Sequence, residues 1–177
     1  MEEIRVNRLP AITWRYLHVN DSPDKFEFPG NSASAVFSDK QYVSEGGTLP
    51  ADFRGASAET LAAAEKGQAY TVIIPEKTEA ELTISITAEE DRPDFAGCFI
   101  FKLEKDAKLN LIWRLSGDRK HSVFATASFY ELMKNAALSV SYLETGLPAS
   151  SLYEQRYAVL GDDAKLDFVS AELGGEK

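Results

Sequence analysis

A short strand motif, Ala-x-Leu-x-apolar, occurs four times in the second half of this chain and constrains its fold more than any other feature. The copies occupy 79–84, 106–111, 135–140 and 163–168, and their alanines are spaced 27, 29 and 28 residues apart. A period of about 20 to 50 residues is typical of folds built from stacked repeats. The repeat therefore predicts a mainly β core in which similar strands stack on one another.

Apolar and polar residues alternate within each copy. Since side chains two residues apart lie on the same face of a strand, one face of each copy is expected to be buried. The small residue that begins each face suits a tight corner where the chain turns inward. The expected inward faces are Ala80, Leu82, Ile84 and Ile86; Ala107, Leu109, Leu111 and Trp113; and Ala136, Leu138, Val140 and Tyr142.

A second apolar strand precedes each copy, at 70–75, 99–103, 128–132 and 157–160, and short polar links join the two. Two arrangements fit this unit. In a parallel β-helix each copy lies directly on the last, whereas in an antiparallel β-sandwich the two strands of a unit form a hairpin. Several links lack the Asn-Gly or Asp-Gly of tight hairpins. The pattern therefore favours the parallel β-helix, with the antiparallel sandwich as the alternative.

The chain divides into an irregular and helical N-terminal region, 1–68, and a β-helix core, 69–177. The segment 57–67 predicts a helix, with Ser57 as N-cap, Glu59 in the first turn and Gly67 ending it in a left-handed conformation. The segment 12–19 fits helical and strand spacing equally well. The turn-rich segment 20–55 predicts a long loop with a few short strands.

Charge and cysteine content exclude several classes of protein. The 177-residue chain has 19 basic and 28 acidic residues and a net charge of -9, which disfavours binding to nucleic acids or anionic membranes. A single cysteine cannot form an internal disulfide bond. The charged N-terminus resembles no signal peptide, and no apolar run is long enough to span a bilayer. A cytoplasmic location is the resulting expectation.

The sequence contains no motif for catalysis or for cofactor binding. Phosphate-binding loops, dinucleotide fingerprints, nucleophile elbows and Cys-x-x-Cys pairs are all absent from it. We therefore expect neither enzymatic activity nor a cofactor held by this chain. Cys98 and His121 are weak candidates for metal or sulfur ligation, against a packing role for Cys98 and an exposed, inert His121. The acidic run 89–91 favours a solvated loop over a cation site.

Three stretches resemble the SufB/SufD family of iron–sulfur cluster assembly proteins. They are the opening segment 6–14, the repeated Ala-x-Leu strands, and the segment 168–175. The resemblance implies a right-handed parallel β-helix that acts as a scaffold with a SufC-type ABC ATPase. It also implies pairing with a SufB/SufD paralogue or with itself, and an iron–sulfur cluster only in the assembled complex.

The chain departs from that family in length, because it stops where family members continue the β-helix and add a C-terminal helical segment. A fragment of a longer protein is therefore expected. Two other functions remain open from the residues alone. One is a homo-oligomeric β-helix interaction module. The other is a carbohydrate-active β-helix enzyme, although the expected outward positions form a mixed set without a carboxylate pair: Glu81, Lys108, Ala137 and Lys165.

Overall fold

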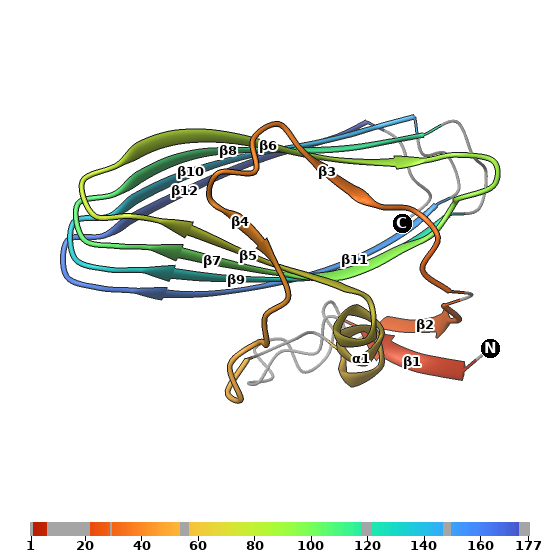
Figure 1. Ribbon diagram of the computed structural model, residues 1–177. Helices are drawn as coiled ribbons and strands as arrows, with labels where there is room; N and C mark the ends of the chain where they lie inside the picture. Colours follow the sequence, from red (N-terminus) through yellow and green to blue (C-terminus); the bar gives the residue numbers. More distant parts are fainter. Residues whose placement is uncertain are drawn as a thin grey trace.

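The computed structural model describes residues 2–6, 22–28, 30–53, 57–117, 122–146 and 150–173. Two five-stranded sheets face each other in this part of the chain (Figure 1). The upper sheet in that view has the order β12 (Lys165–Leu173), β10 (Ala137–Thr145), β8 (Lys108–Gly117), β6 (Glu79–Ala88) and β3 (Ala35–Phe37). The lower sheet has the order β11 (Ser151–Leu160), β9 (Val123–Leu132), β7 (Phe95–Leu103), β5 (Gln68–Ile74) and β4 (Val43–Glu45).

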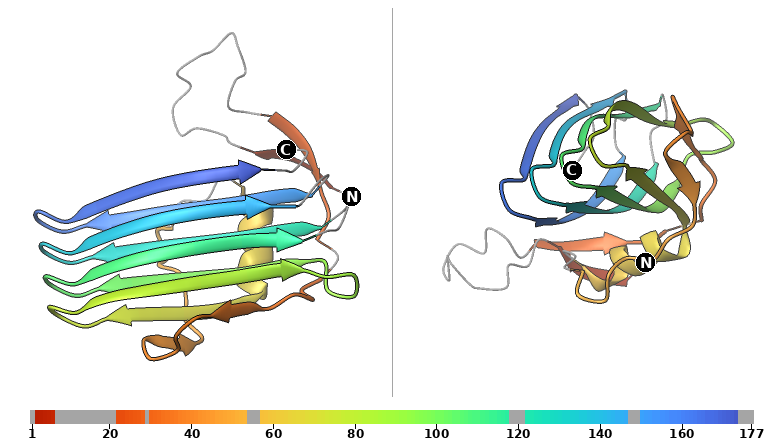
Figure 2. Two further views of the ribbon diagram at one scale, coloured as in Figure 1. Left: turned by 90° about the horizontal axis from the view of Figure 1, so that it is seen from above. Right: turned by 60° about the vertical axis from the view of Figure 1, so that its left-hand side comes forward.

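From β5 onward, strands that follow one another in sequence lie in opposite sheets. The chain runs along β5 in the lower sheet, turns, and returns along β6 in the upper sheet, and the pairs β7–β8, β9–β10 and β11–β12 repeat this path. We call each such pair a rung. Equivalent strands of neighbouring rungs pair in parallel, so the rungs stack as a ladder (Figure 2). The expected parallel β-helix is confirmed, and the hairpin sandwich is excluded because the two strands of a unit do not pair.

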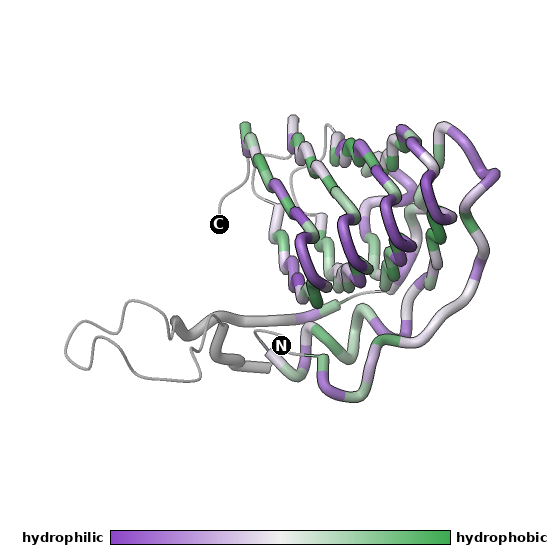
Figure 3. The backbone as a smooth tube through the Cα atoms, turned by 90° about the vertical axis from the view of Figure 1, so that its left-hand side faces the viewer, coloured by the Kyte–Doolittle hydropathy of each residue, from purple (hydrophilic) through white to green (hydrophobic). Residues whose placement is uncertain are grey.

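The polar links form the corners between the sheets. Each corner has one residue in the left-handed region, Lys77, Asp106, Asn135 or Asp163, with φ between 58° and 60°. Asn and Asp adopt this conformation more readily than most residues. The corners also stack, since the Asn135 side-chain amide donates to the Asp106 carboxylate at 2.9 Å. The hydrophilic residues before each motif copy are thus the residues that form the corners (Figure 3).

The stacking register corrects the alignment of the first motif copy. Ala80 lies beside Leu109 and not beside Ala107, so the first copy is displaced by two residues. The later copies stack as the sequence predicts, with Leu109 beside Leu138 and Leu138 beside Leu166. Because the side-chain period of a strand is two, a shift of two residues leaves the same side chains facing inward. The alternation within the copy therefore could not reveal the error.

The inward faces form the core between the sheets, as the alternation predicts. Trp113, 3% exposed, is at its centre. Its ring meets that of Phe99 edge-to-face at a centroid distance of 4.6 Å and lies 6.5 Å from that of Tyr142. Aromatic side chains from the second and third rungs thus pack around one indole, which couples these two rungs to each other.

The N-terminal region covers the first rung. Strand β3 pairs antiparallel with β6, and β4 pairs antiparallel with β5, so both edges of that rung are occupied. These are the short strands expected within 20–55. Strands β1 (Glu2–Val6) and β2 (Ser22–Phe26) form a separate antiparallel pair. The ambiguous segment 12–19 lies outside the described residues.

The predicted helix is present as α1 (Ala58–Lys66), which packs on the outer face of β7 and β9. Ser57 caps it as expected, its hydroxyl accepting from the backbone N–H of Thr60 at 3.4 Å. The left-handed end predicted at Gly67 is wrong, since this residue has φ -83° and ψ -152°. The chain passes straight from Gly67 into β5, and a Cβ there would collide with the carbonyl oxygen of Ala96. Close backbone approach, and not a helix-terminating turn, requires the glycine.

Candidate functional site

The last rung, formed by β11 and β12 and called here the C-terminal rung, has open edges. No described strand pairs with the outer side of either strand, in contrast to the first rung (Figure 2). The N–H groups of Ser151 and Lys165 point back into the ladder, donating to Ser122 and Ala136 respectively, each at 2.9 Å. Because successive N–H groups point to opposite sides of a strand, the even-numbered residues of both strands direct their N–H groups toward the open edge.

The interior changes from apolar to polar along the stack. In the upper sheet, the inward positions Ile84 and Ile86 of the first rung and Trp113 and Leu115 of the second are buried. Two rungs further on, the same two ladders contain Ser170 and Glu172, following Tyr142 and Glu144 of the third rung. In the lower sheet, Thr126 and Ser128 are followed by Glu154 and Arg156. The C-terminal rung therefore presents charged groups where earlier rungs present an apolar core.

Glu154 and Arg156, two residues apart on the inward face of β11, form an ion pair at the end of the core. The Arg156 guanidinium lies 4.1 Å from the ring centroid of Phe168 and 5.2 Å from that of Tyr142, within the range of cation–π attraction. Burial, with a smaller contribution from the charge of Glu172, raises the pKa of Glu154 to about 7 against the opposing effect of Arg156. Burial also raises the pKa of the Tyr142 hydroxyl. The rung thus combines unpaired backbone edges with a partly buried carboxyl group that titrates near neutrality.

The chemistry of this rung is that of recognition. Open strand edges bind extended polypeptide by backbone hydrogen bonds, and the side chains between them select the sequence that binds. Among the described residues, no group of three or more His, Cys, Asp or Glu side chains is placed to hold a metal ion. The feature that distinguishes this rung within the described part of the chain is its pair of open strand edges.

The sequence candidates that the structure describes lie away from this rung. Cys98 is on β7 beneath helix α1, packed with Ala64 and Ile100 and 4% exposed. His121 lies outside the described residues. At the acidic run, Glu89 and Arg92 exchange two backbone hydrogen bonds of 3.1 Å in an exposed turn. These positions favour a packing role for Cys98 and a solvated turn at 89–92.

Cys98 should react very slowly with thiol reagents in the folded protein. Burial, together with the charge of Glu65, raises its thiol pKa to about 12, so the reactive thiolate is scarce near neutrality. Alkylation by iodoacetamide at pH 8, followed by mass spectrometry, should be on the order of a thousandfold slower in buffer than in guanidinium chloride. A folded-state rate within tenfold of the unfolded rate would show that the sulfur is accessible, and would restore Cys98 as a candidate ligand.

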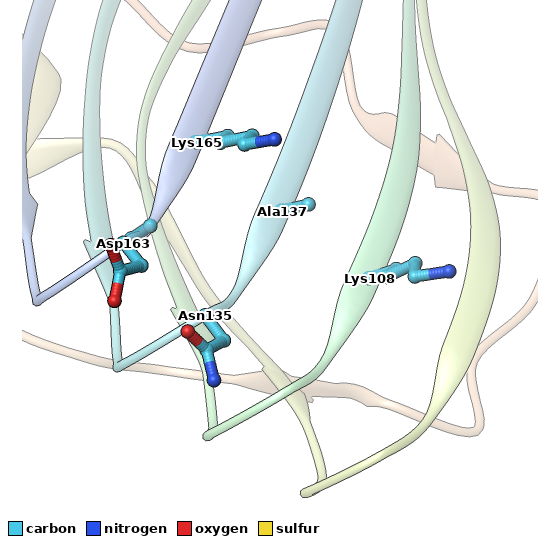
Figure 4. A pocket seen from close by; sticks show the side chains of 6 residues that line it. Lys108, Asn135, Ala137, Asp163 and Lys165 are labelled. Atoms are coloured by element: carbon cyan, nitrogen blue, oxygen red, sulfur yellow. The ribbon is translucent and has the colours of Figure 1, made fainter.

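A shallow depression on the outer face of the upper sheet lies beside the corners (Figure 4). Lys108 and Lys165 point outward on either side of Ala137, with Asn135 and Asp163 below them. The register makes Glu79, not Glu81, the first member of this outward ladder, and Lys108 bonds to Glu79 at 3.5 Å. These side chains are exposed and mixed in charge, so the depression has no enclosed ligand site.

Sequence reasoning missed the charged interior of the C-terminal rung. The alternation that identifies Tyr142 as inward also makes Glu144 inward, and Ser170 and Glu172 continue the inward face of the last copy. Glu154 and Arg156 occupy inward positions of the strand before it. The signal available in the sequence is a polar residue at a position that the alternation assigns to the inward face. It is seen only when the alternation is continued beyond the last apolar residue of each strand.

Within the described part of the chain, no helix is both long enough and apolar enough to cross a membrane. Comparison with known proteins assigns no family to the chain. No family model matches the sequence, and neither the curated proteins nor the solved structures gave a match.

Proposed function

We propose that this chain is a scaffold component of an iron–sulfur cluster assembly complex of the SufB/SufD kind, acting in the cytoplasm with a SufC-type ABC ATPase. The observation that carries the proposal is the parallel β-helix, whose upper-sheet strands are the Ala-x-Leu copies on which the resemblance rests. The first six residues of the resembling stretch 168–175 lie in β12, and its last two are outside the described residues.

The open edges of the described C-terminal rung support a scaffold role. Scaffolds act by holding partners, and an exposed pair of strand edges is a ready surface for another polypeptide. On this proposal an iron–sulfur cluster is cargo of the assembled complex, and the ATPase and a SufB/SufD paralogue or second copy are the partners. The chain itself needs no catalytic residue for that task.

Co-purification tests this proposal directly. An affinity-tagged chain is co-expressed with a SufC-type ATPase from the same genome. The complex is isolated, and its molar mass is measured by light scattering. Recovery of both chains in a fixed ratio is expected, with the nucleotide-binding domain of an ABC transporter as the matched negative control. Equal recovery of the control, or complete absence of the ATPase, would count against an assembly role.

A homo-oligomeric interaction module is the second candidate, favoured by the same open edges. Light scattering of the isolated chain over a wide range of concentration separates the two, because a self-associating module gains mass with concentration. A strict monomer at high concentration would eliminate the module and leave the scaffold proposal intact.

A further inference from the structure

We propose that residues 31–46, called here the N-terminal strap, form an autoinhibitory cap that keeps two copies of this chain from joining through their first rungs. The strap contains β3 and β4, which lie along β6 and β5 respectively (Figure 1). The cap acts at the end of the stack opposite the C-terminal rung. It requires neither iron–sulfur chemistry nor an ATPase.

Hydrogen bonds hold the strap along both strands of the first rung. On β6, the carbonyl oxygen of Thr83 accepts from the Ser38 N–H at 2.9 Å, and the Thr83 N–H donates to the Ser38 hydroxyl, also at 2.9 Å. On β5, the carbonyl oxygen of Ala69 accepts from the Gly46 N–H at 2.7 Å. The strap thereby occupies backbone groups of β5 and β6 that another strand would need in order to pair with this rung.

The strap also covers apolar side chains at this end of the core. Phe37 is 8% exposed, and its ring meets that of Tyr70 edge-to-face at a centroid distance of 4.8 Å. It pairs with Ile84 across β3 and β6, and both Ile84 and the neighbouring core residue Val72 are fully buried. Without the strap these inward side chains would meet solvent. Since burial of apolar surface drives association, a first rung without its strap would favour contact with another chain.

Pro75 makes this end of the ladder unsuited to a further parallel rung. In each later rung, the residue at the equivalent corner position donates its backbone N–H to the rung before it. The three donors are Glu104, Met133 and Gly161, at 3.0, 2.9 and 2.7 Å. Proline has no N–H group, so the first rung cannot make this bond. Parallel stacking of one copy on another, as in a filament, would therefore lack a bond that every rung junction within the chain has.

A second copy fits the same edge in the antiparallel sense. A twofold axis normal to the sheets would bring β6 against β6 of the second copy and β5 against β5, with both pairs antiparallel. Strands β3 and β4 pair with this edge in that same sense, so the strap occupies the place that a second copy would take. Such a contact uses the same surface on both chains and closes at two of them. Release of the strap should therefore produce dimers.

The experiment compares substitutions on the two faces of β3 in the full chain. Phe37→Asp places a carboxylate in the core and should release the strap, whereas Phe37→Ala should weaken its hold. Val36→Asp is the matched control, because it adds the same charge to the same strand at a side chain that is 63% exposed. Hydrogen–deuterium exchange of the strap amides should be at least about tenfold faster in both Phe37 variants than in the wild type, and unchanged in the control.

Light scattering then gives the molar mass over a range of concentration, in about 0.15 M salt to screen the net charge of -9. At the highest concentration Phe37→Asp should reach about twice the wild-type mass, with Phe37→Ala between them and Val36→Asp equal to the wild type. Adding Thr83→Pro to Phe37→Asp should reverse the gain. It removes a donor from the released edge of β6 and leaves the bonds between β6 and β8 in place.

Several results would overturn the proposal. These are faster exchange of the strap with no gain in mass, unchanged exchange in both Phe37 variants, a gain that Val36→Asp shares, or one that Thr83→Pro does not reverse. Growth beyond two chains would contradict the antiparallel pairing. If circular dichroism shows that Phe37→Asp is unfolded, the uncharged Phe37→Ala supplies the same comparisons. Failure of the chain to purify with an ATPase would count against the proposed function and leave this inference standing.

Discussion

Replacing Trp113 by alanine should lower the free energy of unfolding by about 3–5 kcal/mol, the range found for large aromatic residues truncated in cores. The indole is 3% exposed and contacts the rings of Phe99 and Tyr142, which belong to the second and third rungs. Its removal deletes buried apolar surface and leaves a cavity where the rungs meet. Urea unfolding followed by far-ultraviolet circular dichroism measures the loss without relying on tryptophan fluorescence.

The neighbouring residue Ile112 supplies the matched control, because it lies on the same strand and faces outward, where it is only half-buried. Ile112→Ala should cost less than about 1.5 kcal/mol. If the two substitutions proved equally costly, the assignment of inward and outward faces on β8 would be wrong. If Trp113→Ala cost under 1 kcal/mol, the two sheets would not form the single core described above.

Replacing Glu154 by glutamine should make the protein more stable than the wild type above neutral pH, by about 1–3 kcal/mol. The pKa of Glu154 is raised from 4.5 in the unfolded chain to about 7 in the folded protein, chiefly by burial. The folded state therefore binds the proton more tightly. Wild-type stability from this group is fully present below about pH 4.5 and is lost as the pH rises toward and past 7. Glutamine cannot ionise and avoids that loss.

The measurement is the difference in unfolding free energy between the variant and the wild type at a series of pH values from 4 to 9. The difference should rise in favour of Glu154→Gln between about pH 4.5 and 7 and remain constant on either side. Ser128→Ala, in the adjacent inward ladder, introduces no titrating group and should give a constant difference. A flat profile for Glu154→Gln would show that its carboxyl group is solvated and is not part of the core.

The β-helix was predictable because the rules behind it are local. Alternation with a period of two fixes the face of each residue, as at Leu109 and Leu138, and the polar links indicate corners between sheets. The helix at 58–66 was likewise predictable from the Ser57 cap and its alanines. The role of Gly67 was not, because its reason is the backbone of Ala96, which is remote in sequence.

The charged interior of the C-terminal rung could be predicted only in outline. An open rung follows from any stack of strands that has an end, but the charges inside it depend on which residues face each other. Glu154 and Arg156 belong to a strand whose inward face the motif did not cover. The position of Arg156 over Phe168 and Tyr142 arises because the two sheets face each other. Partners, location and any role in cluster assembly stay predictions that the experiments above can test.

The amino-acid sequence by itself determined the repeat, the inward and outward faces of its strands, and the places where the chain turns. These properties depend on backbone geometry over a few residues. Only the tertiary structure decided which residues stack, placing Ala80 beside Leu109, and which side chains meet across the core, placing Arg156 on Phe168. Stacking register is decided by packing and hydrogen bonding between strands about 28 residues apart. A shift of two residues leaves the alternation of inward and outward side chains unchanged, so the sequence pattern cannot detect it.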